Sequence, residues 1–236
     1  MKVIQQNLSR NLERVPQIIE SIMLHRPDVI FLEEFCYPLQ KDSIIAVLEN
    51  EGYTITLPVG FSDEAKTNDK WNACCMLAWC HNTTCFSQTE RSGVIQKYRY
   101  IEGTLVDRHS KASVHCFWGY AQQCFSDAPW MIERKANMLN AIGQFCADHR
   151  HEAFYFGGDL TTDFTSPTAK CRDLLQRILE RPYVKNTYIG PTWNNEQLDY
   201  AVISTKLDAD FKHKTIPIKE TGSDHIALLT EIVPKE

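Results

Sequence analysis

The sequence Gly222-Ser-Asp-His-Ile-Ala-Leu-Leu229 places a carboxylate and an imidazole side by side, directly before an apolar run. The run over 226–229 predicts the start of a buried strand. Asp224 can hold a hard cation through its oxygen atoms, and His225 can exchange a proton near neutral pH. The pair therefore supplies the minimum chemistry for metal-assisted hydrolysis of a phosphate or acyl ester. The same Ser-Asp-His segment is also typical of a turn followed by a surface histidine.

Three further apolar segments carry acids at their ends. Asp28-Val-Ile-Phe-Leu-Glu-Glu34 and Phe154-Tyr-Phe-Gly-Gly-Asp159 each indicate a buried strand that ends in carboxylates, and Asp199 begins another over 199–203. Strand ends are the favoured place for such groups, because an unpaired charge inside a buried strand is costly. If these ends converge, Mg²⁺ or Mn²⁺ would best relieve the repulsion between their carboxylates. For any one acid alone, the simpler interpretation is a strand end that faces water.

Seven short motifs follow one another along the chain: Gln6-Asn7-Leu8, Pro27-Asp28-Val29-Ile30-Phe31-Leu32-Glu33-Glu34, Val114-His115, Gly158-Asp159-Leu160, Thr192-Trp193, Leu198-Asp199-Tyr200 and Ser223-Asp224-His225. Their order and spacing resemble the endonuclease/exonuclease/phosphatase superfamily, whose members have the DNase I-like fold. Each motif is short, but together they cover nearly the whole chain.

The resemblance implies a metal site at the ends of the strands. Glu34 would be the principal metal ligand. Asn7 would lie beside it and contact the metal or the substrate phosphate, and Asp224 would support the metal or His225. The implied cofactor is Mg²⁺ or Mn²⁺.

The resemblance also implies the catalytic groups. Asp159 would orient or deprotonate the attacking water, and His225 would meet the scissile phosphate while Asp199 holds its ring. His115 stands where DNase-like members carry a second histidine across the cleft. Trp193 would border the cleft and contact the substrate.

Two positions depart from the family pattern. The family usually has Gly-Asp-any-Asn, whereas this chain has Thr161 in place of the Asn, followed by Thr162 and Asp163. A Thr hydroxyl cannot donate and accept from the same places as an Asn amide, so Thr161 would do a reduced version of the task, or Asp163 would reorganise the site, or activity would be weak. Glu33 replaces a frequent Gln, and strand alternation places its side chain on the face opposite to Glu34.

Length and composition favour one large domain. With 236 residues, of which 43% are hydrophobic, the chain can bury a sizeable core. Helical patterns over 15–25, 41–52, 130–149 and 169–181 interleave with strand patterns, without repeats or an obvious linker. We therefore expect a single domain over 1–236 of the α/β (α+β) class. Its architecture should be a four-layer DNase I-like sandwich, in which two packed, mainly antiparallel β-sheets are flanked by helices.

The cysteines and the N-terminal residues indicate the cellular compartment of the protein. The nine cysteines are an odd number and scattered, which is typical of reduced thiols in an intracellular protein. Cys75, Cys80 and Cys85 lack the paired spacing of a zinc site. The N-terminus turns polar at once, and no apolar run is long enough to cross a membrane. We expect a soluble, unprocessed, cytoplasmic protein, with a nuclear location left open.

The net charge of −5 bears on the substrate. Tight binding of long duplexes depends on many Lys and Arg contacts to phosphate, which this charge disfavours. We expect a Mg²⁺- or Mn²⁺-dependent phosphodiesterase, first of all a nuclease that cleaves DNA or RNA by in-line attack of an activated water, at a short end or a damaged site. One alternative is a phosphatase or phosphodiesterase for a phosphoinositide or another small phosphoester. The other is a catalytically degenerate member that acts as a binding module. The sequence indicates no protein partner.

Overall fold

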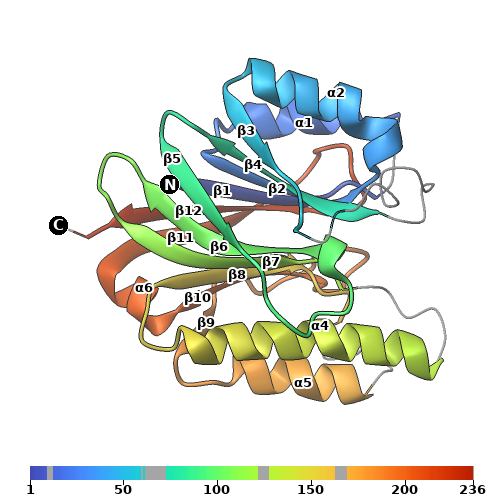
Figure 1. Ribbon diagram of the computed structural model, residues 1–236, viewed down its shortest axis with the longest axis vertical. Helices are drawn as coiled ribbons and strands as arrows, with labels where there is room; N and C mark the ends of the chain where they lie inside the picture. Colours follow the sequence, from blue (N-terminus) through green and yellow to red (C-terminus); the bar gives the residue numbers. More distant parts are fainter. Residues whose placement is uncertain (10–12, 60, 62–72, 122–127, 163–168, 236) are drawn as a thin grey trace.

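Two six-stranded β-sheets pack face to face at the centre of the fold (Figure 1). The computed structural model describes residues 1–9, 13–59, 61, 73–121, 128–162 and 169–235. The first sheet has the strand order β11-β12-β1-β2-β4-β3. Its strands are β1 (Lys2–Asn7), β2 (Val29–Phe35), β3 (Tyr53–Thr56), β4 (Cys74–Cys80), β11 (Phe211–Ile218) and β12 (Ala227–Pro234).

The second sheet has the strand order β5-β6-β7-β8-β10-β9. Its strands are β5 (Thr84–Thr89), β6 (Tyr100–Asp107), β7 (Ser113–Gly119), β8 (Phe154–Asp159), β9 (Val184–Asn186) and β10 (Asp199–Ser204). Each sheet has a single parallel pair at its middle, β1 with β2 and β7 with β8, and the other pairs are antiparallel. The predicted sandwich of two mainly antiparallel sheets is therefore confirmed.

Helices form the outer layers of the sandwich. In Figure 1, α1 and α2 cover the outer face of the first sheet, and α4 and α5 cover the outer face of the second. The helices are α1 (Val15–Met23), α2 (Tyr37–Asn50), α4 (Pro129–Asp148), α5 (Ala169–Leu179) and α6 (Thr205–Asp210), with one 3-10 turn at η1 (Lys97–Arg99). A proline stands in the first turn of α1, α2 and α4, where its missing N–H leaves no helical hydrogen bond unmade.

Three apolar clusters hold the four layers together. Along β2, Val29 and Phe31 point into the cluster between the sheets, whereas Ile30 and Leu32 point into the cluster beneath α1 and α2. This two-residue alternation is what a strand with both faces covered requires. The third cluster fills the space between the second sheet and helices α4 and α5. The central strands of both sheets are thus buried on both faces, which leaves the strand ends as the places for polar chemistry.

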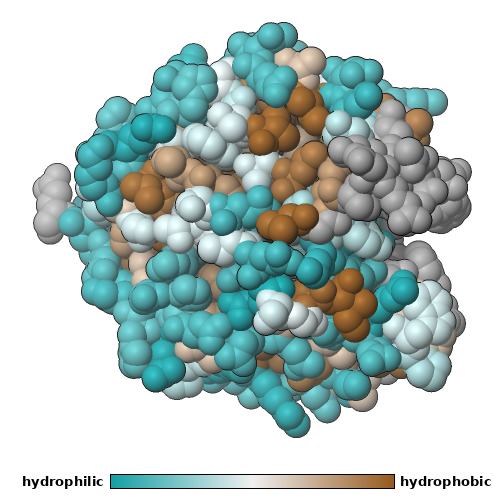
Figure 2. Space-filling model, viewed as in Figure 1, coloured by the Kyte–Doolittle hydropathy of each residue, from teal (hydrophilic) through white to brown (hydrophobic). Residues whose placement is uncertain are grey.

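The helices keep their apolar sides inward. In the view of Figure 2, hydrophobic side chains form small separate patches among hydrophilic ones. None of the described helices combines the length and the apolar character that crossing a membrane requires.

The expected elements agree with the structure apart from a few boundaries. The first helix begins at Val15, as predicted, but the second begins at Tyr37 rather than near 41, because Pro38 is tolerated in a first helical turn. The strand expected over 97–106 starts with the 3-10 turn η1, and β5 was not anticipated. Most of the loop expected over 58–70 lies outside the described residues.

Candidate active site

The ends of five strands meet at one edge of the sandwich. Because β1 and β2 are parallel, Asn7 and Glu34 reach the same edge of the first sheet. In the second sheet, β8 ends at Asp159 directly opposite Asp199, the first residue of the antiparallel β10. His225 immediately precedes β12, which pairs with β1. The topology therefore gathers acids and imidazole from segments far apart in the sequence.

A small cavity of about 140 Å³ opens at this edge. Its walls are Ser9, Glu34, Tyr120, Asp159, Thr161, Trp193, Leu198, Asp224 and His225. Six predicted site residues thus share one cavity. The other two at this edge, Asn7 and Asp199, lie just beneath it and are almost completely buried.

A β-bulge in β2 directs two neighbouring carboxylates toward the site. The register with β4 shifts between Leu32 and Phe35, and Glu34 has a φ of 55°, a left-handed conformation that is rare for residues other than glycine. Glu34 Oε1 accepts a hydrogen bond of 2.6 Å from the Tyr120 hydroxyl. Glu33 Oε1 accepts one of 2.7 Å from the backbone N–H of Asp159. The prediction that the side chains of Glu33 and Glu34 lie on opposite faces is therefore wrong, because the bulge turns Glu34 toward the side of Glu33.

Glu33 lies under the cavity floor with no exposed surface. Burial, followed by the negative charges of Asp199 and Asp159, raises the pKa of Glu33 well above its ordinary value. Its second oxygen, Oε2, has no hydrogen-bond partner among the described residues. A carboxyl group that strongly favours its neutral form therefore lies beneath the site.

Asp159 is fixed by hydrogen bonds from two sides. Its Oδ2 accepts a bond of 2.9 Å from the Asn7 side-chain amide, and its Oδ1 accepts one of 2.7 Å from the backbone N–H of Thr161. Burial and the charge of Asp199 raise the pKa of Asp159 to about 7, although nearby His225 opposes the shift. A carboxylate with this pKa can gain and lose a proton near neutral pH.

Asn7 contacts Asp159 and is not one of the residues that line the cavity. Its amide nitrogen donates to Asp159, and its Oδ1 accepts a bond of 2.7 Å from the backbone N–H of Ser9. Both ends of the amide are therefore engaged, which makes Asn7 a residue that orients Asp159.

His225 and Asp199 form a closely paired imidazole and carboxylate. The Nδ1 of His225 lies 2.9 Å from Oδ2 of Asp199. Burial by itself would lower the pKa of His225, but the hydrogen bond and charge of Asp199, with Asp159 and Asp224 nearby, raise it to about 9. Because Nδ1 is engaged, Nε2 is the ring atom left to face a substrate.

Asp224 and Trp193 form the outer wall of the cavity. Asp224 Oδ1 accepts a hydrogen bond from the Ser9 hydroxyl, and its Oδ2 accepts one of 3.1 Å from the Trp193 indole N–H. Burial would raise the pKa of Asp224, but these bonds and the charge of His225 lower it below its ordinary value. The Trp193 and His225 rings lie 6.2 Å apart, centroid to centroid, so an aromatic surface borders the imidazole.

Thr161 takes an unusual backbone conformation. Its φ is 44°, which is strained for a β-branched residue. Its hydroxyl donates to the carbonyl oxygen of Ala121 at 3.0 Å, so its hydrogen is committed to the backbone. Thr161 therefore shapes the cavity wall while its N–H holds Asp159. Asp163, expected to reorganise the site, lies outside the described residues.

His115 does not lie at this edge. It pairs with Phe154, five residues before Asp159 on β8, which places it about 16 Å along the strand from the cavity. The expectation that His115 faces His225 across the cleft is therefore wrong. The residue that follows β7 into the cavity is Tyr120, whose position just past a predicted strand was the available signal.

The cavity suits a hard cation. Its acidic side chains offer oxygen ligands, and among the described residues none of its lining side chains is a lysine or arginine. Its carboxylate oxygens are not packed as tightly as the ligands of an all-protein cage. Mg²⁺ commonly keeps several waters and uses one or two carboxylates, so Glu34 and Asp224 fit its needs.

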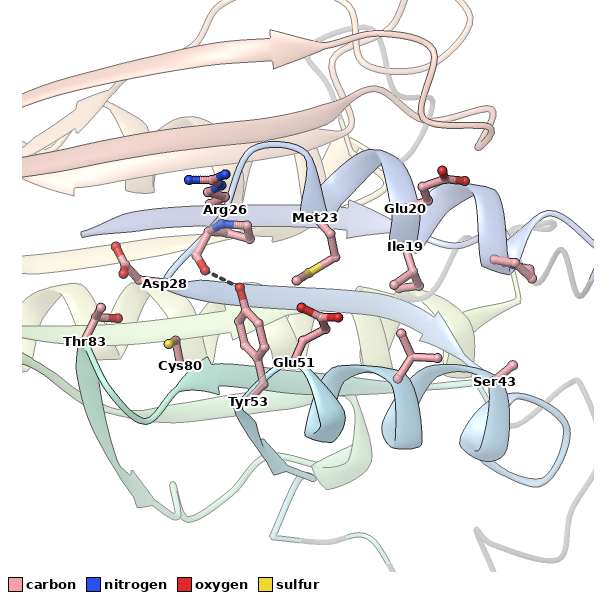
Figure 3. Close-up of a pocket in the computed structure, with 13 residues that line it drawn as sticks. Ile19, Glu20, Met23, Arg26, Asp28, Ser43, Glu51, Tyr53, Cys80 and Thr83 are labelled. Carbon is pink, nitrogen blue, oxygen red and sulfur yellow. Dashed lines mark hydrogen bonds between the residues drawn. The ribbon is translucent and has the colours of Figure 1, made fainter.

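A larger cavity of about 880 Å³ lies elsewhere, between α1, α2 and the nearby ends of β2 and β4 (Figure 3). Ile19 and Met23 line it, and the Tyr53 hydroxyl donates to the Pro27 carbonyl at its edge. Among the described residues that line it there is no imidazole, and its acids Glu20, Asp28 and Glu51 do not form a metal-ligand group. Size alone therefore does not identify the active site, and the chemistry favours the smaller cavity.

No protein-family model matches the sequence, and no curated protein matches it either. Solved structures match across almost the whole length. The human Nocturnin catalytic domain with bound sulfate is 16% identical, with a TM-score of 0.72 over 99% of this chain and 94% of that one. D. rerio TDP2 with a single-strand DNA product is 13% identical, with a TM-score of 0.69 over 98% of each chain.

An AP endonuclease from Archaeoglobus fulgidus is 14% identical, with a TM-score of 0.69 over 98% of this chain and 99% of that one. Together with the strand order and the flanking helices, these likenesses show that the chain has the DNase I-like fold.

Proposed function

We propose that this protein is a Mg²⁺- or Mn²⁺-dependent phosphodiesterase and that its substrate is a nucleic acid. The observation that carries the proposal is the cavity that Asp159 and His225 both line, with Asp199 paired to His225 beneath it. A base with a pKa near 7 and a charged imidazole are the two groups that hydrolysis of a phosphodiester requires beside a cation.

Glu34 and Asp224 would hold the cation. A bound divalent ion would neutralise the phosphate and stabilise the charge that develops on its oxygens. The Tyr120 hydroxyl donates to Glu34, and Ser9 and Trp193 donate to Asp224, so both carboxylates are oriented before any ligand arrives.

Asp159 would position the attacking water and accept its proton. The Asn7 amide and the Thr161 N–H fix both of its oxygens, which sets the direction of approach. As the water oxygen bonds to phosphorus, the bond to the leaving oxygen breaks. His225 would donate a hydrogen bond to the phosphate through Nε2 while Asp199 stabilises its positive charge.

The structural neighbours support nucleic acid as the substrate class. One was solved with a single-strand DNA product, and another is an AP endonuclease. Trp193 offers this chain an aromatic face at the cavity rim, on which a base or sugar could stack. With a net charge of −5 and a cavity of about 140 Å³, a short end or a damaged site fits better than a long duplex.

A small phosphoester is the second candidate substrate, because the cavity is small and no lysine or arginine among the described residues lines it. A panel of single-stranded, duplex and abasic DNA, RNA and an inositol phosphate, each with Mg²⁺ or with EDTA, separates the two. We expect Mg²⁺-dependent cleavage of at least one oligonucleotide. Cleavage of the inositol phosphate alone would favour the second candidate, and no turnover on any substrate would favour a binding module.

Two variants test the mechanism. Asp159→Asn and His225→Ala should each abolish cleavage while far-UV circular dichroism stays unchanged. Asp173→Asn and His81→Ala alter exposed residues away from the cavity and are the matched controls. Unchanged turnover in both site variants would contradict the mechanism.

A further inference from the structure

A second cluster of metal-ligand side chains lies at the other end of the central strands of the second sheet, away from the cavity. His115 lies on β7, His149 is the C-cap of α4, and Glu152 follows in the next turn. Their ligand atoms all lie within 4.8 Å of one another. The Oε2 of Glu152 is 3.3 Å from His115 Nε2 and 2.5 Å from His149 Nδ1, and the two imidazole rings stack at 4.2 Å.

We propose that His115, His149 and Glu152 form a binding site for a divalent transition-metal ion of the Zn²⁺ type. Two histidines and a glutamate are a known zinc donor set, with a fourth position left for water. The three side chains are 30%, 22% and 52% exposed, so an ion can reach them from solvent.

The geometry needs little adjustment. Zinc bonds of about 2.0–2.1 Å in a tetrahedron separate neighbouring ligand atoms by about 3.3 Å. The His115–Glu152 pair already has this separation. The His149–Glu152 pair must widen by less than 1 Å, which an exposed glutamate can do by a small rotation. The ligands therefore sit close to their bound positions.

The surrounding groups favour the ligand form of His115. The Thr104 hydroxyl lies 3.2 Å from Nδ1 of His115 and can accept its hydrogen, which leaves the lone pair on Nε2, the atom that faces Glu152.

Backbone hydrogen bonds hold the turn that carries the other two ligands. The N–H of Glu152 donates to the His149 carbonyl, and the N–H of His115 donates to the Ala153 carbonyl, both at 2.9 Å. A bound ion would join the end of α4 to the strands β7 and β8. Its effect would be structural, because the site lies about 16 Å along β8 from the cavity.

An ion pair between Glu152 and a protonated His149 is the competing explanation of the short contact. That ion pair does not involve His115. The His115 ring is nevertheless stacked on His149, and its Nε2 points toward the same Glu152 oxygen. The metal site accounts for all three side chains.

The test is Zn²⁺ binding to the full chain, stripped with EDTA, kept reduced, and titrated against a chromogenic chelator. We expect His149→Ala and His115→Gln to lose one equivalent of tight Zn²⁺ binding. His109→Ala, which changes an exposed histidine on the β6–β7 hairpin, should retain it. Thr104→Val should weaken binding by at least about tenfold, as loss of an outer-shell partner does.

Two further readouts keep the test decisive. Co²⁺ should give tetrahedral visible bands without thiolate charge-transfer absorption, and Zn²⁺ should raise the melting temperature of the wild type but not of His149→Ala. The proposal is overturned if the stoichiometry is the same in wild type and His149→Ala, or if thiolate bands show that cysteines hold the ion. None of these readouts depends on catalysis, so the outcome is independent of the proposed function.

Discussion

Replacing Glu33 with glutamine should stabilise the fold at neutral pH. Glu33 has no exposed surface and lies beside Asp159 and Asp199, so its pKa is well above the ordinary value of 4.5. Above about pH 4.5 the unfolded chain releases this proton, whereas the folded chain keeps it up to the raised pKa of Glu33. Retaining the proton costs about 1.4 kcal/mol for each pH unit between these two pKa values.

The sign of the pH dependence follows from proton binding. Between pH 4.5 and the raised pKa, the folded state binds more protons than the unfolded state, so the wild-type free energy of unfolding decreases as pH rises. Glutamine keeps an oxygen for the Asp159 N–H and has no proton to lose. The advantage of Glu33→Gln should therefore be near zero at pH 4.5 and grow by about 1.4 kcal/mol for each pH unit up to the raised pKa of Glu33.

Urea denaturation at pH 4.5 and pH 7 in EDTA measures this difference, because a bound cation would change the charge balance. Each kcal/mol of advantage corresponds to a rise in melting temperature of about 2–4 °C for a chain of this size. Glu49→Gln, an exposed change on α2, is the control and should stay within about 0.5 kcal/mol of wild type at both values. An equal advantage at both pH values, or a less stable variant at pH 7, would refute the reasoning.

Three other changes give sharp expectations. Tyr120→Phe removes the hydroxyl that donates to Glu34 and should lower kcat/KM by about tenfold or more, measured on the best oligonucleotide, with little loss of stability. Thr161→Asn should raise the free energy of unfolding by about 1 kcal/mol and increase turnover, because Asn adopts a positive φ with less strain; slower turnover would show a site tuned to the Thr hydroxyl. Gly103→Ala should destabilise by more than about 2 kcal/mol in urea, because the added Cβ would lie 2.2 Å from the Ser87 carbonyl oxygen; a loss under about 0.5 kcal/mol would contradict the packing of β5 on β6.

The sequence predicted the sandwich because its buried strands are apolar and carry their acids at the ends. Asp159 and Asp199 meet as expected, since antiparallel pairing puts the end of β8 opposite the start of β10. The sequence could not predict that Glu33 and Glu34 point to the same side, because a bulge depends on the pairing of β2 with β4 and leaves no mark in the strand itself.

His115 shows a second limit of the sequence. An apolar strand with a polar residue near one end does not reveal which end reaches the functional edge. His115 lies near the start of β7 and Tyr120 follows its end, and only the parallel pairing with β8 decides that Tyr120 belongs to the cavity. The sequence therefore placed the second histidine, His115, at the wrong end of the strands.

The strand order also determines where this protein is open to self-association. Of the four outermost strands, β3 and β9 have only four and three residues, and β11 carries Lys212, Lys214 and Pro217, all of which discourage pairing with another chain. The remaining one, β5, has six residues with neither charge nor proline. Unpaired backbone groups along β5 are thus the place where fibril-like or swapped contacts would begin, and a lysine introduced there would guard against them.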